Sequence, residues 1–342
     1  MKIGITGATG FVGSHLVRHL SSQGHNIVAY GRSKPAENLL KFADFRLWDI
    51  TRPILERCEA DIFIHCAGFV DTWGRYRDMY DLNVMGTKRA LEFAEGAEHF
   101  IYMSTASVYN PWYGKHLATE DSLYPEKYAN NYGATKAQAE RMVKDFSNKY
   151  RKVTILRPHV IYGPGDRHIV PRILKFAERG KEFVIGDGTN EFSITHVGNI
   201  CYAVSLLLAA KLEMFRIFNV TDDKTLTVNE LLKRLCLAFD LHPRVYNVPY
   251  LAAYGIAVLF ETQNRIFSHK KTPLFTRDIV RQFSQESTLS IEKIKRDLHY
   301  DPPYDFNNGI QDIKLWVDSI GGRKEYISNP NEKVWQGKLF TY

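Results

Sequence analysis

A glycine-rich turn near the start of the chain restricts the folds that this sequence can adopt. The apolar run 2–5 leads into Thr6-Gly7-Ala8-Thr9-Gly10-Phe11-Val12-Gly13, and an apolar-periodic helix over 12–23 follows. Glycine permits a tight turn, lets backbone N–H groups reach a pyrophosphate and lets the helix pack closely on the strand. The helix N-terminus then offers unpaired donors and a positive dipole end to an anion. This context predicts dinucleotide binding by Gly7, Thr9, Gly10, Phe11, Val12 and Gly13.

Strand-like apolar runs alternate with amphipathic helical segments up to about residue 161. The predicted strands are 2–6, 26–30, 45–48, 61–66, 99–104 and 152–157, and the predicted helices include 12–23, 79–95 and 129–148. Such alternation indicates a parallel sheet with helices on both faces. The predicted fold class is therefore α/β, a doubly wound parallel Rossmann sheet, with ligands beyond the carboxyl ends of its strands.

The pattern becomes irregular after Gly163. A loop at 163–166, a helix over 170–180 and a turn at 186–188 precede a strand over 215–220, which returns to the sheet, and a helix over 228–239. We expect a smaller, discontinuous C-terminal lobe that binds the substrate. In this division, residues 1–162 plus 200–222 form the dinucleotide-binding domain, and residues 163–199 plus 223–342 form the substrate-binding lobe.

Composition narrows the class of protein and its partners. The 342 residues are 44% hydrophobic and 24% charged, with a formal net charge of +7. Acidic residues interrupt the basic ones, so the charge fits a small anionic ligand rather than nucleic acid. The most apolar stretch, 251–260, is too short to cross a bilayer. It predicts a packed helix, with an apolar entrance for the substrate as the alternative. We expect a cytoplasmic protein without an integral membrane segment.

The cysteines and histidines do not suggest a metal site. Cys58, Cys66, Cys201 and Cys236 show no Cys-x-x-Cys spacing and lie in apolar surroundings, and His65 has no second ligand at metal-binding spacing. Buried free thiols in a reducing compartment explain the cysteines best.

The end of the second strand bears on which nicotinamide cofactor binds. An NAD site normally ends this strand with Asp or Glu, which accepts hydrogen bonds from the ribose. Here Gly31 is followed by Arg32, Ser33 and Lys34. An arginine can hold a 2′-phosphate, and no carboxylate repels it. The sequence therefore favours NADP, with NAD as the alternative.

After the third strand, Asp49, with Ile50 beside it, could accept a hydrogen bond from the adenine amino group. A helix N-cap or a turn residue is the alternative interpretation of Asp49.

Tyr132 and Lys136 form the predicted catalytic pair. They lie at i and i+4 in Tyr132-Gly133-Ala134-Thr135-Lys136, on one face of the predicted helix. Hydride movement at a carbon requires a proton at the attached oxygen, which a tyrosine can supply or accept. A nearby ammonium is expected to lower the tyrosine pKa towards neutrality. At a strand end, Thr105 is predicted to hold the reacting oxygen, and Ser104 to line the nicotinamide pocket.

These motifs, in order, resemble the extended short-chain dehydrogenase/reductase family over nearly the whole chain. Further segments that carry the resemblance are His65-Cys66-Ala67-Gly68, Asn83-Val84-Met85-Gly86-Thr87 and Leu156-Arg157-Pro158. The resemblance implies that Tyr132 is the acid/base, Lys136 its activator and ribose anchor, and Thr105 the hydroxyl partner. It also implies a homodimer and cofactor contacts from Cys66, Ala67, Gly68, Asn83, Pro158 and Val160, with Asn83 as a structural helper near the active site. Phe69, Thr105, His159 and Arg167 are the candidate substrate contacts, and a structural loop residue is the alternative for His159 and Arg167.

Later motifs bear on the branch of the family. Nucleotide-sugar epimerases and dehydratases commonly carry an arginine that grips a diphosphate shortly before the segment matching His196-Val197, and Phe192 stands there. The segments 163–172 and 272–277 resemble 3β-hydroxysteroid and sterol dehydrogenases and bacterial ketone reductases. They favour a bulky, largely apolar alcohol or ketone. A nucleotide-sugar enzyme and a catalytically silent NADP sensor are the alternatives.

Overall fold

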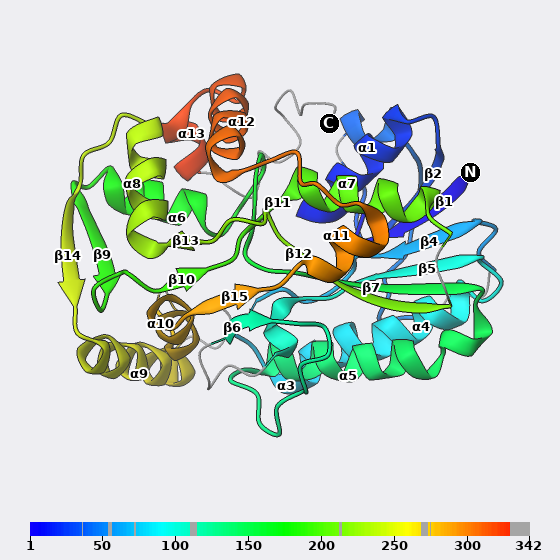
Figure 1. Cartoon of the computed structure of the whole chain (residues 1–342), viewed down its shortest axis with the longest axis horizontal. Coiled ribbons are helices and arrows are strands. Elements are labelled where there is room, and N and C mark those ends of the chain that lie inside the picture. Colours follow the sequence, from blue (N-terminus) through cyan, green and yellow to red (C-terminus); the bar gives the residue numbers. More distant parts are fainter. Residues whose placement is uncertain are drawn as a thin grey trace.

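The core of the protein is a seven-stranded sheet in the order β12-β7-β5-β4-β1-β2-β3 (Figure 1). The computed structural model describes residues 1–35, 37–53, 57–71, 73–109, 115–211, 214–267, 273 and 275–328. The strands are β1 (Lys2–Thr6), β2 (Asn26–Gly31), β3 (Asp44–Leu47), β4 (Ile62–His65), β5 (His99–Met103), β7 (Lys152–Pro158) and β12 (Phe215–Val220). All neighbouring strands are parallel. The strand order is that of a doubly wound sheet.

The sheet confirms the predicted strands, each within one residue at either end. Their near-continuous apolar character follows from burial on both faces, as parallel strands require. Every residue of β4 and of β5 is buried. The expected α/β class with a doubly wound parallel sheet is therefore confirmed.

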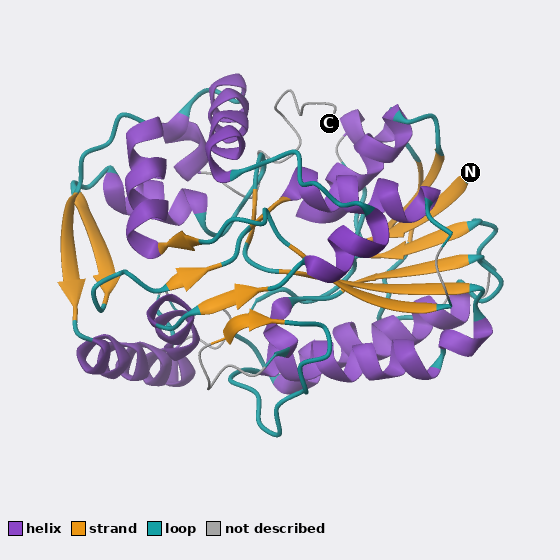
Figure 2. Cartoon of the chain, viewed as in Figure 1, coloured by secondary structure: helices purple, strands orange, loops and turns teal. Residues whose placement is uncertain are grey.

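Helices cover both faces of this sheet (Figure 2). On one face lie α1 (Phe11–Ser22), α7 (Val197–Ala209) and α11 (Glu292–Leu298), which share a core with β1 and β4. On the other lie α3 (Tyr76–Tyr80), the π-helical turn η1 (Asp81–Met85), α4 (Gly86–Phe93) and α5 (Asn131–Asp145). The helix predicted over 79–95 is thus interrupted by a π-helical turn, a feature that often marks functional sites. Short helices complete this region: α2 (Glu37–Leu40), η2 (Ala106–Val108) and η3 (Ser147–Lys149).

A second body, built mostly from the later chain, lies beside the carboxyl ends of the strands (Figure 1). Its helices are α6 (Val170–Ala177), α8 (Val228–Ala238), α9 (Tyr250–Phe267), α10 (Arg277–Ser284), α12 (Phe306–Ser319) and α13 (Arg323–Ser328). Its four-stranded sheet contains β13 (Leu226–Thr227), β10 (Glu191–Phe192), β15 (Ser287–Leu289) and β6 (Lys115–Ala118). Two strand pairs join β8 (Ile161–Tyr162) to β11 (Thr195–His196) and β9 (Lys181–Ile185) to β14 (Arg244–Val248). The proposed domain boundaries remain a prediction.

None of the helices described is both long and apolar enough to span a bilayer. No cluster of three or more His, Cys, Asp or Glu side chains within the described ranges could hold a metal ion.

Candidate active site

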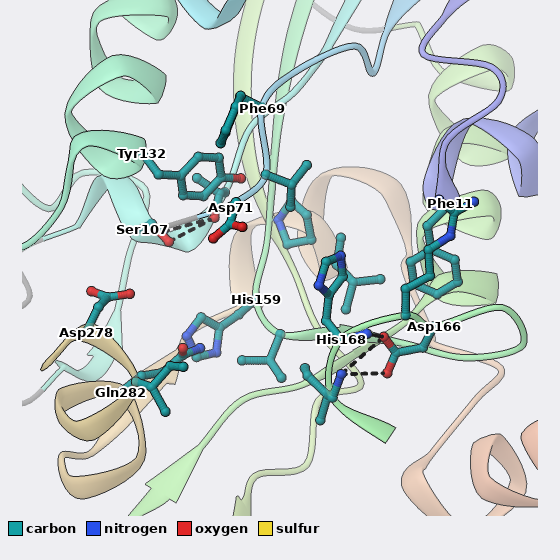
Figure 3. A pocket seen from close by; sticks show the side chains of 18 of the residues that line it. Phe11, Phe69, Asp71, Ser107, Tyr132, His159, Asp166, His168, Asp278 and Gln282 are labelled. Atoms are coloured by element: carbon teal, nitrogen blue, oxygen red, sulfur yellow. Dashed lines mark hydrogen bonds between the residues drawn. The ribbon is translucent and has the colours of Figure 1, made fainter. Parts of the chain in front are cut away.

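A cavity of about 1280 Å³ lies at the carboxyl ends of the central strands. The glycine turn, the ends of β2, β4, β5 and β7, and the start of α5 contribute to its wall, together with α6, β9, α9 and α10. Figure 3 shows Tyr132, Phe69 and Asp71 on one side of this cavity and Phe11 and His168 on the other. The cavity therefore brings the sheet and the later elements to one site, where ligands of such sheets bind.

The glycine turn fits a dinucleotide pyrophosphate. Gly7 has a φ of +65°, and a Cβ there would lie 2.7 Å from the backbone nitrogen of Ala67. A Cβ on Gly13 would lie 2.2 Å from the Gly7 carbonyl oxygen. Gly10 ends the turn without a side-chain cap on α1, and the first turn of α1 holds no acidic residue. The N–H groups at the start of α1 are thus left for an anion, and Gly7, Thr9, Gly10, Phe11, Val12 and Gly13 all line the cavity.

At the ends of β2 and β3, the structure brings only some of the predicted residues to the cavity. Arg32, Asp49 and Ile50 line it, whereas Ser33 and Lys34 are exposed outside its wall. Asp49 forms a turn, because its Oδ1 accepts hydrogen bonds from the N–H and hydroxyl of Thr51 at 3.0 and 2.8 Å. These bonds lower the pKa of Asp49. Arg32 is thus the cationic group at the end of β2 that reaches the cavity.

The segment after β4 reaches the cavity through Cys66, Ala67, Gly68 and Phe69. Asn83, on η1, does not line it. Its Oδ1 accepts from the N–H of Phe69 at 2.7 Å, and its Nδ2 donates to Thr135 Oγ1 at 3.0 Å. Asn83 therefore ties Phe69 to α5 and positions the wall of the site.

The start of α5 carries Tyr132 and Lys136 into the cavity. Asn130 caps the helix, because its Oδ1 accepts from the N–H of Gly133 at 2.8 Å. A Cβ on Gly133 would lie 2.5 Å from the Ser107 carbonyl oxygen, so this glycine lets α5 pack against the segment after β5. That packing brings the start of α5, with Tyr132, beside Thr105 and Ser107 in the wall of the cavity.

Two contacts at the end of β5 fix the Nζ atom of Lys136. Its Nζ donates to the Met103 carbonyl oxygen at 2.7 Å and lies 4.2 Å from the centre of the Tyr102 ring. Burial lowers the pKa of Lys136 to about 7, although the Glu140 carboxylate opposes this shift. The ammonium is thus fixed at the end of β5 by a carbonyl and an aromatic face.

Burial raises the pKa of Tyr132 to about 12, and the Thr105 hydroxyl opposes the shift. The sequence-based expectation that Lys136 brings this pKa towards neutrality is wrong for this structure. Desolvation disfavours the phenolate, while Lys136 binds the Met103 carbonyl and is itself desolvated. Tyr132 therefore keeps its proton at neutral pH, which suits an acid better than a base.

The serine and threonine residues after β5 differ in their partners. Thr105 Oγ1 accepts from the N–H of Ser107 and donates to its hydroxyl, both at 3.2 Å. Ser104 is buried, and its Oγ has no hydrogen-bond partner within the described chain. Both Ser104 and Thr105 line the cavity, so each offers a hydroxyl to a ligand there.

Pro158, His159 and Val160 line the cavity at the end of β7. His159 Nδ1 lies 2.6 Å from the Ser193 carbonyl oxygen, so it carries the proton, and Nε2 accepts from the Ser287 hydroxyl at 3.2 Å. Val160 has a φ of +44°, which is unusual for a β-branched residue and typical of strained functional loops.

Arg167 lines the cavity with an Nε that has no hydrogen-bond partner in the described residues, and burial lowers its pKa. Arg172 lines the cavity as well. Burial also lowers the pKa of Arg172, although the carboxylates of Asp71 and Asp166 oppose this shift. Both cations thus reach the cavity at some desolvation cost.

Sequence reasoning missed the contribution of α9 and α10. The apolar part of the wall includes Ile173, Phe176, Ile185, Ile256, Phe260, Phe275 and Phe283, and its polar groups include Asp71, Asp278 and Gln282. Asn130, the cap of α5, donates from Nδ2 to Asp278 on α10 at 2.7 Å, a contact across 148 residues of sequence. The sequence held two signals for this wall: the apolar stretch 251–260, whose Ile256 and Phe260 line the cavity, and the segment 272–277, whose Phe275 lines it.

Phe192 occupies the position where a nucleotide-sugar enzyme would carry its arginine. Phe192 is buried in β10 and packs edge-on against Phe283. A buried aromatic side chain cannot clamp a diphosphate. Of the segment 272–277, Thr272 and Leu274 lie outside the described residues.

Comparison with known proteins gives the family of the chain. The chain is similar to a 2-alkyl-3-oxoalkanoate reductase from Stenotrophomonas maltophilia, at 29% identity over 92% of this chain and 98% of that protein. It is also similar to a decarboxylating sterol-4-alpha-carboxylate 3-dehydrogenase from Mus musculus, at 27% identity over 88% and 86%.

Among solved structures, UDP-glucuronic acid 4-epimerase from Bacillus cereus in complex with NAD has a TM-score of 0.73 at 21% identity, covering 96% of this chain and 99% of that one. This likeness shows the fold alone. The family model described as "NAD dependent epimerase/dehydratase family" matches residues 3–221, which is more than half of the chain. The protein therefore belongs to the NAD dependent epimerase/dehydratase family, which confirms an NAD(P)-dependent enzyme of the extended short-chain dehydrogenase/reductase type.

Proposed function

We propose that the protein is an NADP-dependent oxidoreductase that interconverts a ketone and a secondary alcohol on a bulky, largely apolar molecule. The observation that carries this proposal is the composition of one cavity. Its wall joins the glycine turn to Tyr132, Thr105 and Lys136, and continues into the apolar side chains of α6, β9 and α9. A hydride donor and an apolar carbonyl compound can meet there.

A bound nicotinamide dinucleotide supplies or accepts the hydride at the carbon. In the reducing direction, Tyr132 donates its phenolic proton to the carbonyl oxygen, which becomes the hydroxyl of the product. Thr105 donates a hydrogen bond to the same oxygen and orients the phenol. Because burial raises the pKa of Tyr132 to about 12, the proton is present at neutral pH, and the residue is set to act as an acid.

Arg32 supports NADP over NAD. It lines the cavity at the end of β2, where NAD sites carry a carboxylate. A guanidinium there can bind the 2′-phosphate through two N–H donors. NAD is the alternative cofactor.

Two partly desolvated arginines in the wall of the cavity support a substrate class. Arg167 and Arg172 favour an anionic group on an otherwise apolar molecule. Both named relatives act, by their names, on molecules with a carboxylate near an oxygen at carbon 3. We propose a 3-oxo carboxylic acid with large apolar substituents.

Two further proposals concern the whole chain. We propose the domain division 1–162 plus 200–222 and 163–199 plus 223–342, with the substrate bound between the two parts. We also propose a homodimer through α4 and α5, which lie on the same face of the sheet.

The test is a pair of titrations followed by a substrate screen. We expect NADPH to bind at least about tenfold more tightly than NADH, a difference of about 1.4 kcal/mol. We then expect NADPH oxidation with a 2-alkyl-3-oxo acid and none with UDP-glucose or UDP-glucuronic acid. Micromolar binding of a UDP-sugar would instead support the nucleotide-sugar alternative, and the absence of turnover with every carbonyl compound would support the silent sensor.

A further inference from the structure

Helix α9 presents an apolar face to solvent. Among the described residues, nineteen large apolar side chains are exposed, and seven of them lie on this one helix: Tyr250, Leu251, Ile256, Val258, Leu259, Phe260 and Ile266. Monomeric soluble proteins seldom expose such contiguous apolar surface, and a patch of this kind usually marks an interaction site.

The burial pattern of α9 reverses the usual amphipathic arrangement. Ala253, Ala257 and Glu261, spaced four residues apart, form a narrow stripe that is buried against the protein. Leu251, Leu259 and Ile266 lie on the opposite side and are 81%, 70% and 64% exposed. A surface helix normally buries its large apolar residues. Here the small and acidic residues are inside, and the large aliphatic ones are outside.

The two charged residues of α9 also differ in their exposure to solvent. Its one acidic residue, Glu261, is buried and accepts two hydrogen bonds from Arg277, from the backbone N–H and from Nε, both at 2.8 Å. Its one basic residue, Arg265, is exposed and lies over the ring of Trp73, 5.5 Å from its centre. The solvent face of α9 therefore carries large apolar side chains, the uncharged polar residues Thr262 and Gln263, and a single cation with an aromatic ring beside it. That combination matches an anionic lipid surface, in which aromatic side chains lie at headgroup level.

The same helix forms part of the cavity wall. Ile256 and Phe260 line the cavity and are also 44% and 43% exposed. Val70, on the segment after β4, lines the cavity as well and is exposed. The apolar surface of α9 is thus continuous with the apolar lining of the site.

We propose that α9 lies along the surface of an anionic lipid bilayer and that the apolar substrate enters the cavity from the bilayer past Ile256 and Phe260. The helix has 18 residues and is about 27 Å long. It lies at the edge of the molecule, away from the central sheet (Figure 1). Its outward side chains would reach into the boundary between headgroups and acyl chains, as in helices that lie in the membrane plane. Docking of α9 on a bilayer does not depend on the proposed reaction, whereas the proposed path of the substrate rests on that reaction.

The test is co-sedimentation of the full-length protein with vesicles. The variant Leu251→Gln/Leu259→Gln/Ile266→Gln removes the outward apolar face, and none of these residues lines the cavity. The control Leu47→Gln/Leu123→Gln/Leu315→Gln changes three similarly exposed leucines elsewhere. Vesicles of phosphatidylcholine with one quarter phosphatidylglycerol are the probe. Thermal melting and NADPH titration confirm that both variants fold.

We expect wild type and control to sediment with these vesicles, and the α9 variant to bind at least tenfold more weakly. Vesicles without phosphatidylglycerol are expected to bind wild type more weakly than the anionic ones. Failure of wild type to bind, or equal binding by the α9 variant, overturns the proposal. The proposal is also overturned if wild type is a dimer, the α9 variant is a monomer, and both bind vesicles equally well. A second copy of the chain would then cover the apolar face of α9. No turnover is measured, so failure of the proposed reaction leaves this test intact.

Discussion

The buried ion pair between Glu140 and Arg157 fixes α5 against the end of β7. Arg157 donates from Nη2 to Glu140 Oε2 at 2.6 Å and from Nε to Oε1 at 3.0 Å. The two side chains are 0% and 2% exposed, and the Tyr124 hydroxyl also donates to the carboxylate at 2.5 Å. Burial alone would lower the pKa of Arg157, but Glu140 raises it, so the guanidinium stays charged. Neutralising Glu140 therefore leaves a buried, unbalanced cation.

We expect Glu140→Gln to lower the free energy of unfolding by about 2–4 kcal/mol. Removing one partner of a buried ion pair costs about 3–5 kcal/mol. The amide oxygen can still accept one hydrogen bond, which offsets about 1 kcal/mol. The control is Glu92→Gln, whose partner Lys88 lies 3.7 Å away on an exposed face of α4. That change is expected to cost less than about 1 kcal/mol.

The assay is urea unfolding at pH 7, followed by both tryptophan fluorescence and far-UV circular dichroism. Coincident transitions justify a two-state treatment of each variant. If Glu140→Gln costs no more than Glu92→Gln, the pair does not hold α5, and the reasoning about this buried cluster is refuted.

Three further predictions concern the cofactor site. Arg32→Ala should weaken NADPH binding about 10- to 100-fold, the equivalent of one charge-assisted contact, and leave NADH binding nearly unchanged; fluorescence titration distinguishes this from an equal loss for both. Gly13→Ala should abolish NADPH binding in calorimetry, because its Cβ would lie 2.2 Å from the Gly7 carbonyl oxygen, whereas Gly255→Ala, with open space around it, should not. Burial lowers the pKa of Lys136 to about 7 from its ordinary 10.5. Between these pH values the unfolded chain binds more protons than the folded one, so the free energy of unfolding rises with pH. In urea unfolding, the free energy of wild type relative to Lys136→Met should therefore rise from pH 7 to about 9.5. A difference that does not change with pH would contradict the lowered pKa of Lys136.

The sequence predicted the features that local patterns determine. The strands of the central sheet were recognisable because each is a short apolar run between turns. The i and i+4 spacing of Tyr132 and Lys136 placed both on α5, and both line the cavity. The glycine turn was predicted because its geometry demands glycine at Gly7 and Gly13.

The rest of the site depends on contacts between distant segments. Asn83 resembles a cofactor residue in sequence, but its amide is used by Phe69 and Thr135. The pKa of Tyr132 is set by burial, which the spacing to Lys136 does not reveal. Asp278 accepts a hydrogen bond from Asn130, the cap of α5, across 148 residues of sequence, and no local pattern predicts this contact.

The most direct test of the central claim is the rate of hydride transfer in Tyr132→Phe, measured by rapid mixing of the NADPH complex with a 2-alkyl-3-oxo acid. The account predicts NADPH binding close to that of wild type and a rate lowered at least about 100-fold, the usual contribution of a positioned acid. A rate within a few fold of wild type would contradict the account, because the proton would then come from another group.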